Sequence, residues 1–163
     1  MNFQDAIRKQ FSMADFFLES YVADLAPAEL LARPAPGANH IAWQLGHLIS
    51  AEARLVGAAA PGKMPTLPDG FAERHSKDTA ASDNPADFLT KEAYFALNKK
   101  VRTQSLEALE SLSEADFDKP ITGRVPAFVK TAGDALVTAA GHWILHSGQW
   151  VVLRRHLGRD RKF

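Results

Sequence analysis

Apolar residues recur at spacings of three and four along most of this chain, which is the pattern of helices that bury one face. Between residues 2 and 25 the apolar positions are Phe3, Ile7, Phe11, Ala14, Leu18, Tyr21 and Leu25. This periodicity predicts an amphipathic helix over residues 2–25. One further turn of helix is expected at residues 27–32, before the stretch "RPAPGAN" breaks the chain.

The same periodicity, together with capping and breaking residues, predicts three more helices. They are expected over residues 39–60, 84–112 and 131–157. Asn39 is a suitable N-cap for the first, and Asn84 followed by Pro85 is a typical start for the second. Gly158 is an ordinary stop signal for the last.

Two irregular connections separate these helices, and neither they nor the helices alternate polar and apolar residues as a strand does. The first covers residues 61–83 and is rich in Pro, Gly and Ser; the second contains "DFDKPITGRVPAF". A loop as long as the first is usually mobile or functional. The pattern predicts an all-α fold, a four-helix bundle with long connections, formed as a single domain over residues 1–163.

Composition excludes several classes of function. The 163 residues include 19 basic and 19 acidic side chains, so no net charge favours a nucleic acid or an anionic membrane as partner. The absence of cysteine excludes disulfides, thiolate metal sites and cysteine nucleophiles. Any metal must therefore be bound by His, Asp or Glu.

One stretch has no charged side chain, between residues 135 and 153, and as a helix it is about 28 Å long. That length is nominally enough to cross a bilayer, but the stretch contains two histidines, a glutamine and a serine. A central helix of a soluble bundle is the better interpretation. The first residues, "MNFQDAIRKQF", form no signal-peptide core, so a cytoplasmic location is expected.

The segment "GHWILHSGQW" places His142 and His146 four residues apart within this uncharged stretch. On a helical wheel they share an arc of about 80° with Thr138 and Gln149. A solvated stripe would normally carry Lys, Arg, Asp or Glu, and this one carries none. Two imidazoles at i and i+4 can chelate a metal ion, or they can be core residues satisfied by hydrogen bonds. The sequence has neither a His-Glu-x-x-His nor a Glu-x-x-His motif, which argues against a zinc-protease helix and a ferritin-like di-iron site.

A third ligand must come from another part of the chain, where the candidates are His40, His47, His75 and His156. The wheel places His47 about 120–150° from the apolar stripe of its helix, so periodicity alone does not direct it into the core. Glu52, by contrast, falls in the middle of that stripe. A buried carboxylate needs a partner, so Glu52 is expected either to form a structural ion pair or to accept a hydrogen bond from a metal ligand.

The motif "NHIAWQLGHLISAE", followed later by "GHWILHSGQWVVLRRHLG", resembles the DinB/YfiT-like superfamily. The segments "LLARPAPGANHIAW" and "LEALESLSEADFDKPI" extend the resemblance over nearly the whole chain. It implies a four-helix bundle of unusual connectivity, commonly a homodimer, with one divalent metal bound by three histidines. Carried over to this sequence, those ligands are His47, His142 and His146, and Gln149 matches the Gly-Gln element that follows the pair.

Three protein ligands and an open position are typical of a catalytic metal site. The resemblance implies a small-molecule substrate and a thiol-dependent transferase or isomerase that uses bacillithiol, mycothiol or glutathione; metal-assisted hydrolysis is the other reaction considered. Zn, Ni or Fe would suit the histidines. Asn98 and Arg102 are candidates to orient a substrate carboxylate, or they face water at the core edge, and His75 is a candidate acid or base. The rival hypotheses are a non-catalytic dimeric metal-binding module linked to stress responses, and a bundle that binds no metal.

Overall fold

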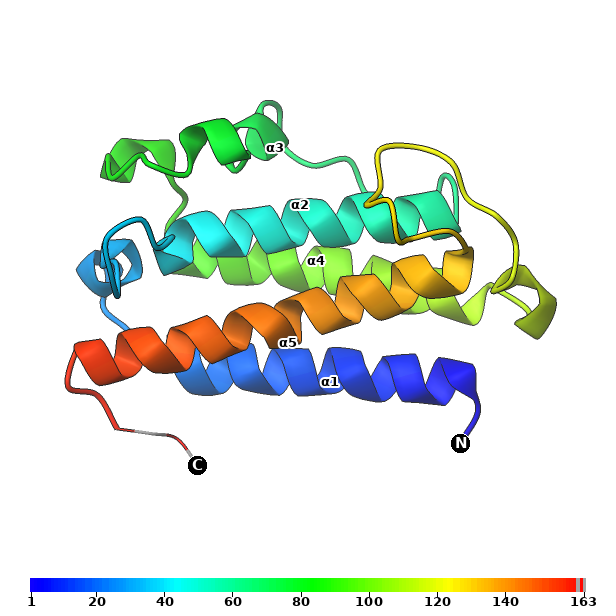
Figure 1. Ribbon diagram of the computed structural model, residues 1–163, viewed down its shortest axis with the longest axis horizontal. Coiled ribbons are helices and arrows are strands. Elements are labelled where there is room, and N and C mark those ends of the chain that lie inside the picture. The colour runs from blue at the N-terminus through cyan, green and yellow to red at the C-terminus, as the bar shows by residue number, and fades with distance from the viewer. Residues whose placement is uncertain (161, 163) are drawn as a thin grey trace.

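Four long helices lie side by side in the computed structural model, which describes residues 1–160 and 162 (Figure 1). They are α1 (Phe3–Val22), α2 (Ile41–Ala59), α4 (Lys91–Glu110) and α5 (Ala132–His156). Helix α5 packs against both α1 and α2, and α2 also packs against α4. The described residues contain no strand, only an isolated bridge between Pro120 and Thr131. The predicted all-α bundle is confirmed.

Each long helix begins where a side chain caps the free N–H groups of its first turn. Capping boxes start α1 and α5, the latter through Thr131 and Asp134, and Thr90 caps α4. The cap of α2 is His40, whose Nδ1 accepts the Trp43 N–H at 3.1 Å, so the prediction of Asn39 as N-cap is wrong by one residue. The predicted bounds of the first, second and last helices differ from the observed ones by one to three residues.

The start of α4 is the largest error in the predicted helix bounds. Asn84 and Pro85 begin only a short 3-10 turn, η3 (Pro85–Asp87), and the chain then extends through Phe88 before α4 starts at Lys91. The Phe88 ring lies edge-on to His40, with centroids 4.6 Å apart. A helix cannot run continuously from residue 84, because the backbone at Phe88 is extended.

The connection between α2 and α4 is partly helical and is tied to the bundle. It contains α3 (Phe71–Arg74) and η2 (Lys77–Thr79), and in Figure 1 it runs alongside α2. The Trp43 indole donates to the Ser76 carbonyl at 3.1 Å, and His40 Nε2 donates to the Ser82 carbonyl at 3.0 Å. The remaining 3-10 turns are η1 (Pro27–Leu31), at the predicted position, and η4 (Glu114–Asp116).

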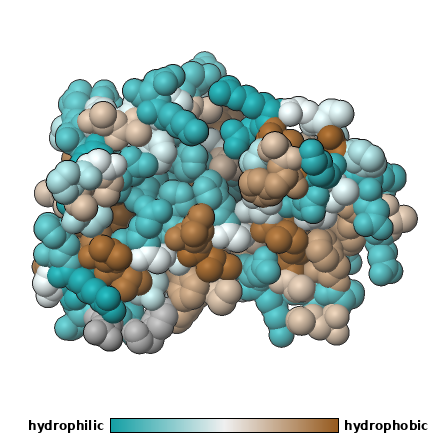
Figure 2. Space-filling model, viewed as in Figure 1, coloured by the Kyte–Doolittle hydropathy of each residue, from teal (hydrophilic) through white to brown (hydrophobic). Residues whose placement is uncertain are grey.

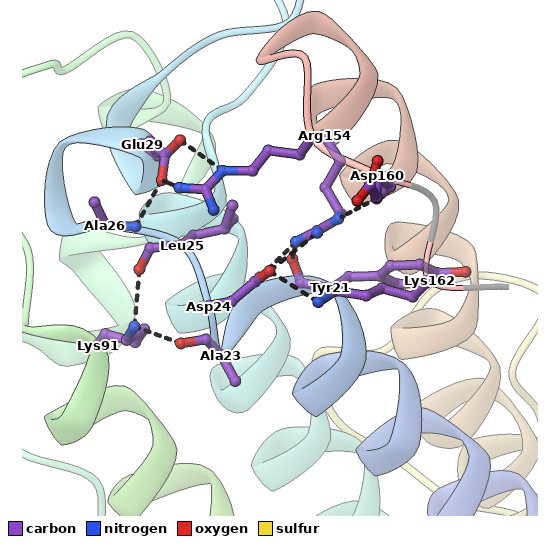
Figure 3. Close-up of polar contacts among 11 residues, drawn as sticks. Tyr21, Ala23, Asp24, Leu25, Ala26, Glu29, Lys91, Arg154, Asp160 and Lys162 are labelled. Atoms are coloured by element: carbon purple, nitrogen blue, oxygen red, sulfur yellow. Dashed lines mark hydrogen bonds and ion pairs between the residues drawn. The ribbon is translucent and has the colours of Figure 1, made fainter.

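The carboxyl end of α5 is fastened to the corner between α1 and η1 (Figure 3). Buried Arg154 pairs with Asp24 and also donates to the Tyr21 carbonyl at 3.0 Å. Beside it Arg159 pairs with Glu29. These contacts hold the end of α5 against the end of α1 and against η1. Within the described ranges, no helix combines the length and apolarity that crossing a membrane requires.

Candidate metal centre

Three histidines from two helices meet at the interface of α2 and α5. His47 comes from α2, and His142 and His146 come from successive turns of α5. One ring nitrogen of each lies within 4.8 Å of the corresponding atoms of the other two. The ring centroids are 4.8 Å apart for the α5 pair and 5.0 Å apart for His47 and His142. The packing of α2 on α5 thus completes a group that neither helix could form alone.

Packing and hydrogen bonds orient two of these rings. The His47 ring is stacked on the indole of Trp43, with centroids 4.8 Å apart and planes inclined by 10°. His146 is buried, and its Nδ1 lies 2.9 Å from the Gln44 side-chain oxygen. His47 and His142 are only half-buried, so one side of the group faces solvent.

The three imidazoles are neutral at pH 7, because burial disfavours the charged form of each ring. Burial, together with smaller effects of the nearby His47 and Arg54, lowers the pKa of His142 to about 4. Burial likewise lowers the pKa of His146 to about 3. The pKa of His47 is lowered by burial, partly offset by a hydrogen bond with the His75 backbone. Neutral imidazole is the form that binds a metal ion.

These observations fit a divalent metal ion. A donor set of three neutral imidazole nitrogens suits a borderline metal such as zinc, and each residue of the group offers one nitrogen at close range. The nitrogen of His146 that points away from Gln44 remains available for such an ion. The group could therefore hold a metal ion, with the half-exposed side left for a further ligand.

Glu52 has the structural role that its place in the apolar stripe suggested. Its carboxylate is fully buried and accepts from Arg102, Ser105 and the Trp143 indole, the last at 2.6 Å. Burial lowers the pKa of Arg102, but the attraction of Glu52 and, to a smaller extent, Asp15 outweighs it and leaves that pKa raised. The buried carboxylate therefore forms a structural ion pair with a buried arginine.

Arg102 contacts α1 and α2, and no described hydrogen bond joins Arg102 or Asn98 to the three histidines. Arg102 is 4% exposed, and four of its five N–H groups donate to Glu52, Asp15 and the Phe11 carbonyl. The prediction that Arg102 orients a substrate carboxylate is at odds with its burial in these contacts, and the alternative that both side chains face water is wrong. Asn98 is also buried and lines a cavity between α1 and α4.

The remaining candidate residues either form hydrogen bonds elsewhere or are exposed. His75 is 2% exposed; its Nδ1 donates to the Phe71 carbonyl at 2.7 Å, and the Tyr94 hydroxyl donates to its Nε2 at 2.7 Å. Both nitrogens are thus engaged, which leaves none for the acid or base role considered for it. His40 is occupied as the cap of α2, and His156 is exposed near the end of α5. Gln149 is exposed and forms no hydrogen bond with another described residue.

Two residues beside the histidines were not predicted. Gln44 is a polar side chain in the otherwise apolar start of α2, and this was the signal that could have identified it. Arg54 lies seven residues after His47, on the same helix face, and its charge lowers the pKa of both His47 and His142. Within the described part of the chain, Arg54 pairs with no carboxylate.

The fold and the site together define the class of this protein. It is a helical bundle with three histidines between α2 and α5. Residues 17–150 match the family model of the DinB superfamily. The chain belongs to the DinB superfamily. A comparison with curated proteins gives no match.

Proposed function

We propose that this protein is a divalent-metal-dependent enzyme whose metal ion is bound by His47, His142 and His146. The observation that carries the proposal is the convergence of three imidazole nitrogens within 4.8 Å of one another, at the half-exposed edge of a helix interface. Because the rings are uncharged at pH 7, no proton has to leave before a metal ion binds. The nitrogen-only donor set suits Zn, Ni or Fe.

The open side of the group supports a catalytic rather than a structural site, because three protein ligands leave room for a fourth. A divalent metal supplies Lewis acidity there, which lowers the pKa of a coordinated water or thiol. Two reaction classes follow for a small-molecule substrate, namely transfer to or from a low-molecular-weight thiol and metal-assisted hydrolysis. We also propose that the protein is cytoplasmic.

Arg54 is the residue that we expect to bind the substrate or thiol at this open side. Its guanidinium is near enough to lower the pKa of His47 and His142, and it pairs with no carboxylate among the described residues. Arginine binds carboxylate or phosphate groups through parallel hydrogen bonds. An anionic group on the substrate or the thiol would therefore be held beside the histidines by Arg54.

The decisive experiment is metal analysis of untagged protein after supplementation with Zn, Ni and Fe in turn. One metal ion per chain is expected for the wild type and for His156→Ala, a matched control with an exposed histidine on the same helix. His47→Ala and His142→Ala are expected to lose it. A wild type that holds no stoichiometric metal, and whose Tm is unchanged by a chelator, would contradict the proposal.

Turnover is tested next, with glutathione, bacillithiol and mycothiol as thiol donors and with activated esters and amides as hydrolysis substrates. Metal-dependent product formation that is lost in His142→Ala supports the enzyme. Stoichiometric metal without turnover on any of these substrates favours the alternative, a non-catalytic metal-binding module.

We also propose that the protein is a homodimer, and the outer face of α5 supports this. Val137, Leu145 and Val152 are exposed there, Leu145 by 69% of its surface. Figure 2 shows hydrophobic side chains spaced along the face on which α5 lies. A Cβ added at Gly141 or Gly148 would meet nothing within 4 Å, so a second copy of α5 could approach the backbone closely.

A further inference from the structure

Gln44 is a fully buried polar side chain in the first turns of α2, and it faces α5. It is 2% exposed. Its Nε2 lies 2.7 Å from the Asn39 carbonyl oxygen, and its Oε1 lies 2.9 Å from both Trp150 Nε1 and His146 Nδ1. One amide therefore links the start of α2 to two residues of α5.

The neighbours of this amide determine which of its ends is the oxygen. A backbone carbonyl can only accept a hydrogen bond, so the group facing Asn39 must be the amide NH2. An indole N–H can only donate, so the group facing Trp150 must be the amide oxygen. Rotating the amide by half a turn would set two acceptors against each other on one side and two donors on the other.

The orientation of Gln44 in turn determines the proton on His146. Because Oε1 can only accept, His146 Nδ1 must carry a hydrogen and donate it. A neutral ring has one N–H, so its Nε2 holds a lone pair. His142 has no such partner, since no described residue forms a hydrogen bond with either of its ring nitrogens.

We infer that Gln44 is a positioning residue that holds His146 in its Nδ1–H form, with Nε2 free to coordinate the metal ion. The metal part of this inference rests on the proposed function, whereas the proton position does not. Metal-binding histidines commonly donate their second N–H to an oxygen, and losing that partner typically reduces metal affinity about 10–100-fold. Trp150 supports this arrangement, because its indole N–H donates to the amide oxygen and keeps it directed at α5.

The first measurement detects the proton directly in metal-free protein. Nitrogen-15 NMR of the His146 ring is expected to show Nδ1 as the protonated nitrogen and Nε2 as the unprotonated one in the wild type. In Gln44→Met, which has similar volume and no acceptor, this preference is expected to disappear. Trp150→Phe keeps the Gln44–His146 bond and is the control, and it is expected to retain the Nδ1–H form.

The second measurement is affinity for Zn²⁺ by competition with a chromophoric chelator. A decrease of about 10–100-fold is expected for Gln44→Met. Trp150→Phe and the surface variant Gln149→Met are expected to stay within about threefold of the wild type. Gln44→Met leaves the buried Trp150 N–H without an acceptor, which costs about 1–3 kcal/mol. If that variant does not fold, Gln44→Met/Trp150→Phe, which has no orphaned donor, carries the test.

The inference is overturned if the folded Gln44 variants keep the Nδ1–H form, or bind Zn²⁺ as tightly as Trp150→Phe. Failure of the proposed function has a different signature. A wild type that binds no metal, yet shows the Nδ1–H form only when Gln44 is present, would contradict the metal site and leave the positioning role of Gln44 standing.

Discussion

Glu52 and Arg102 form a bidentate ion pair inside the bundle, with Nε and Nη2 each donating to the carboxylate at 2.9 Å. The pair joins α2 to α4, and the Trp143 indole of α5 donates to the same carboxylate. Asp15 of α1 accepts from Arg102 at 2.8 Å. All four long helices therefore contribute to one polar cluster, which specifies how they pack.

Removing one partner of this pair is expected to destabilise the fold strongly. Glu52→Leu leaves the buried guanidinium without its main counter-charge, which typically costs about 3–5 kcal/mol. Glu52→Leu/Arg102→Met is expected to lose less than the sum of the two single variants, because the only charge that it leaves without a partner is the partly exposed Asp15 carboxylate. Urea denaturation followed by circular dichroism measures these free energies. Additive losses would show that the two side chains act independently.

Gly46 and Gly141 provide a matched pair of glycines in the two helices of the site. A Cβ at Gly46 would lie 2.1 Å from Cδ2 of buried His75, whereas a Cβ at Gly141 would meet nothing within 4 Å. Gly46→Ala is therefore expected to displace His75 and destabilise the protein by about 1–3 kcal/mol. Because Gly141 lies on the proposed dimer face, it is tested in the monomeric Leu145→Glu background, where Gly141→Ala is expected to be neutral or to stabilise the monomer by about 0.5–1 kcal/mol.

The displacement of His75 has a local readout. Limited proteolysis of Gly46→Ala is expected to cleave residues 61–83 faster than in the wild type, because His75 anchors that connection through Phe71 and Tyr94. If residues 61–83 of Gly46→Ala are cleaved at the wild-type rate, His75 does not anchor this connection.

Acid is expected to destabilise the metal-free protein before its carboxylates titrate. Five histidines have a pKa below the ordinary 6.5 in the folded chain, mainly through burial: His40, His47, His75, His142 and His146. Below pH 6.5 the unfolded chain binds protons that the folded chain does not, so stability falls as pH falls. The decline continues until the folded rings titrate, near pH 4 for His142 and near pH 3 for His146.

Each such histidine contributes up to about 1.4 kcal/mol per pH unit over this range. Urea denaturation with a chelator present, from pH 7 to pH 4.5, measures the slope. His142→Ala is expected to flatten it. A slope that His142→Ala leaves unchanged would contradict the lowered pKa of this ring in the folded state.

The outer face of α5 gives a test of the proposed dimer. Leu145→Glu places a charge on that face and is expected to convert the dimer to a monomer, as measured by light scattering after size-exclusion chromatography. Phe128→Glu is the control, because Phe128 is 70% exposed but precedes α5 in the connection after α4. A monomeric wild type, or an equal effect of both variants, would contradict an interface on α5.

Much of the architecture was predictable from periodicity, because a bundle helix must bury one stripe of its surface. The positions of α1 and α2 followed from that stripe, and the position of α5 followed from its long uncharged run and the stop signal at Gly158. Glu52 was also predictable as a buried group in need of a partner, since it interrupts an apolar stripe. The start of α4 was not, because Asn84 and Pro85 suit a 3-10 turn as well as a long helix.

The site was only half determined by local pattern. The i, i+4 spacing brings His142 and His146 together on any helix, but His47 lies off the apolar stripe of α2, and only the resemblance to a family assigned it. The roles of Gln44 and Arg54 depend on which helices face each other. No periodicity within α2 shows that its Gln44 meets an indole N–H and an imidazole of α5.

The sequence by itself thus determined the helical class, the four long helical segments and one histidine pair, because these depend on residues close together in the chain. The tertiary structure decided the third histidine, the buried partner of Glu52 and the proton on His146. Each of these depends on a contact between residues far apart in the chain, which exists only once α2, α4 and α5 have packed together.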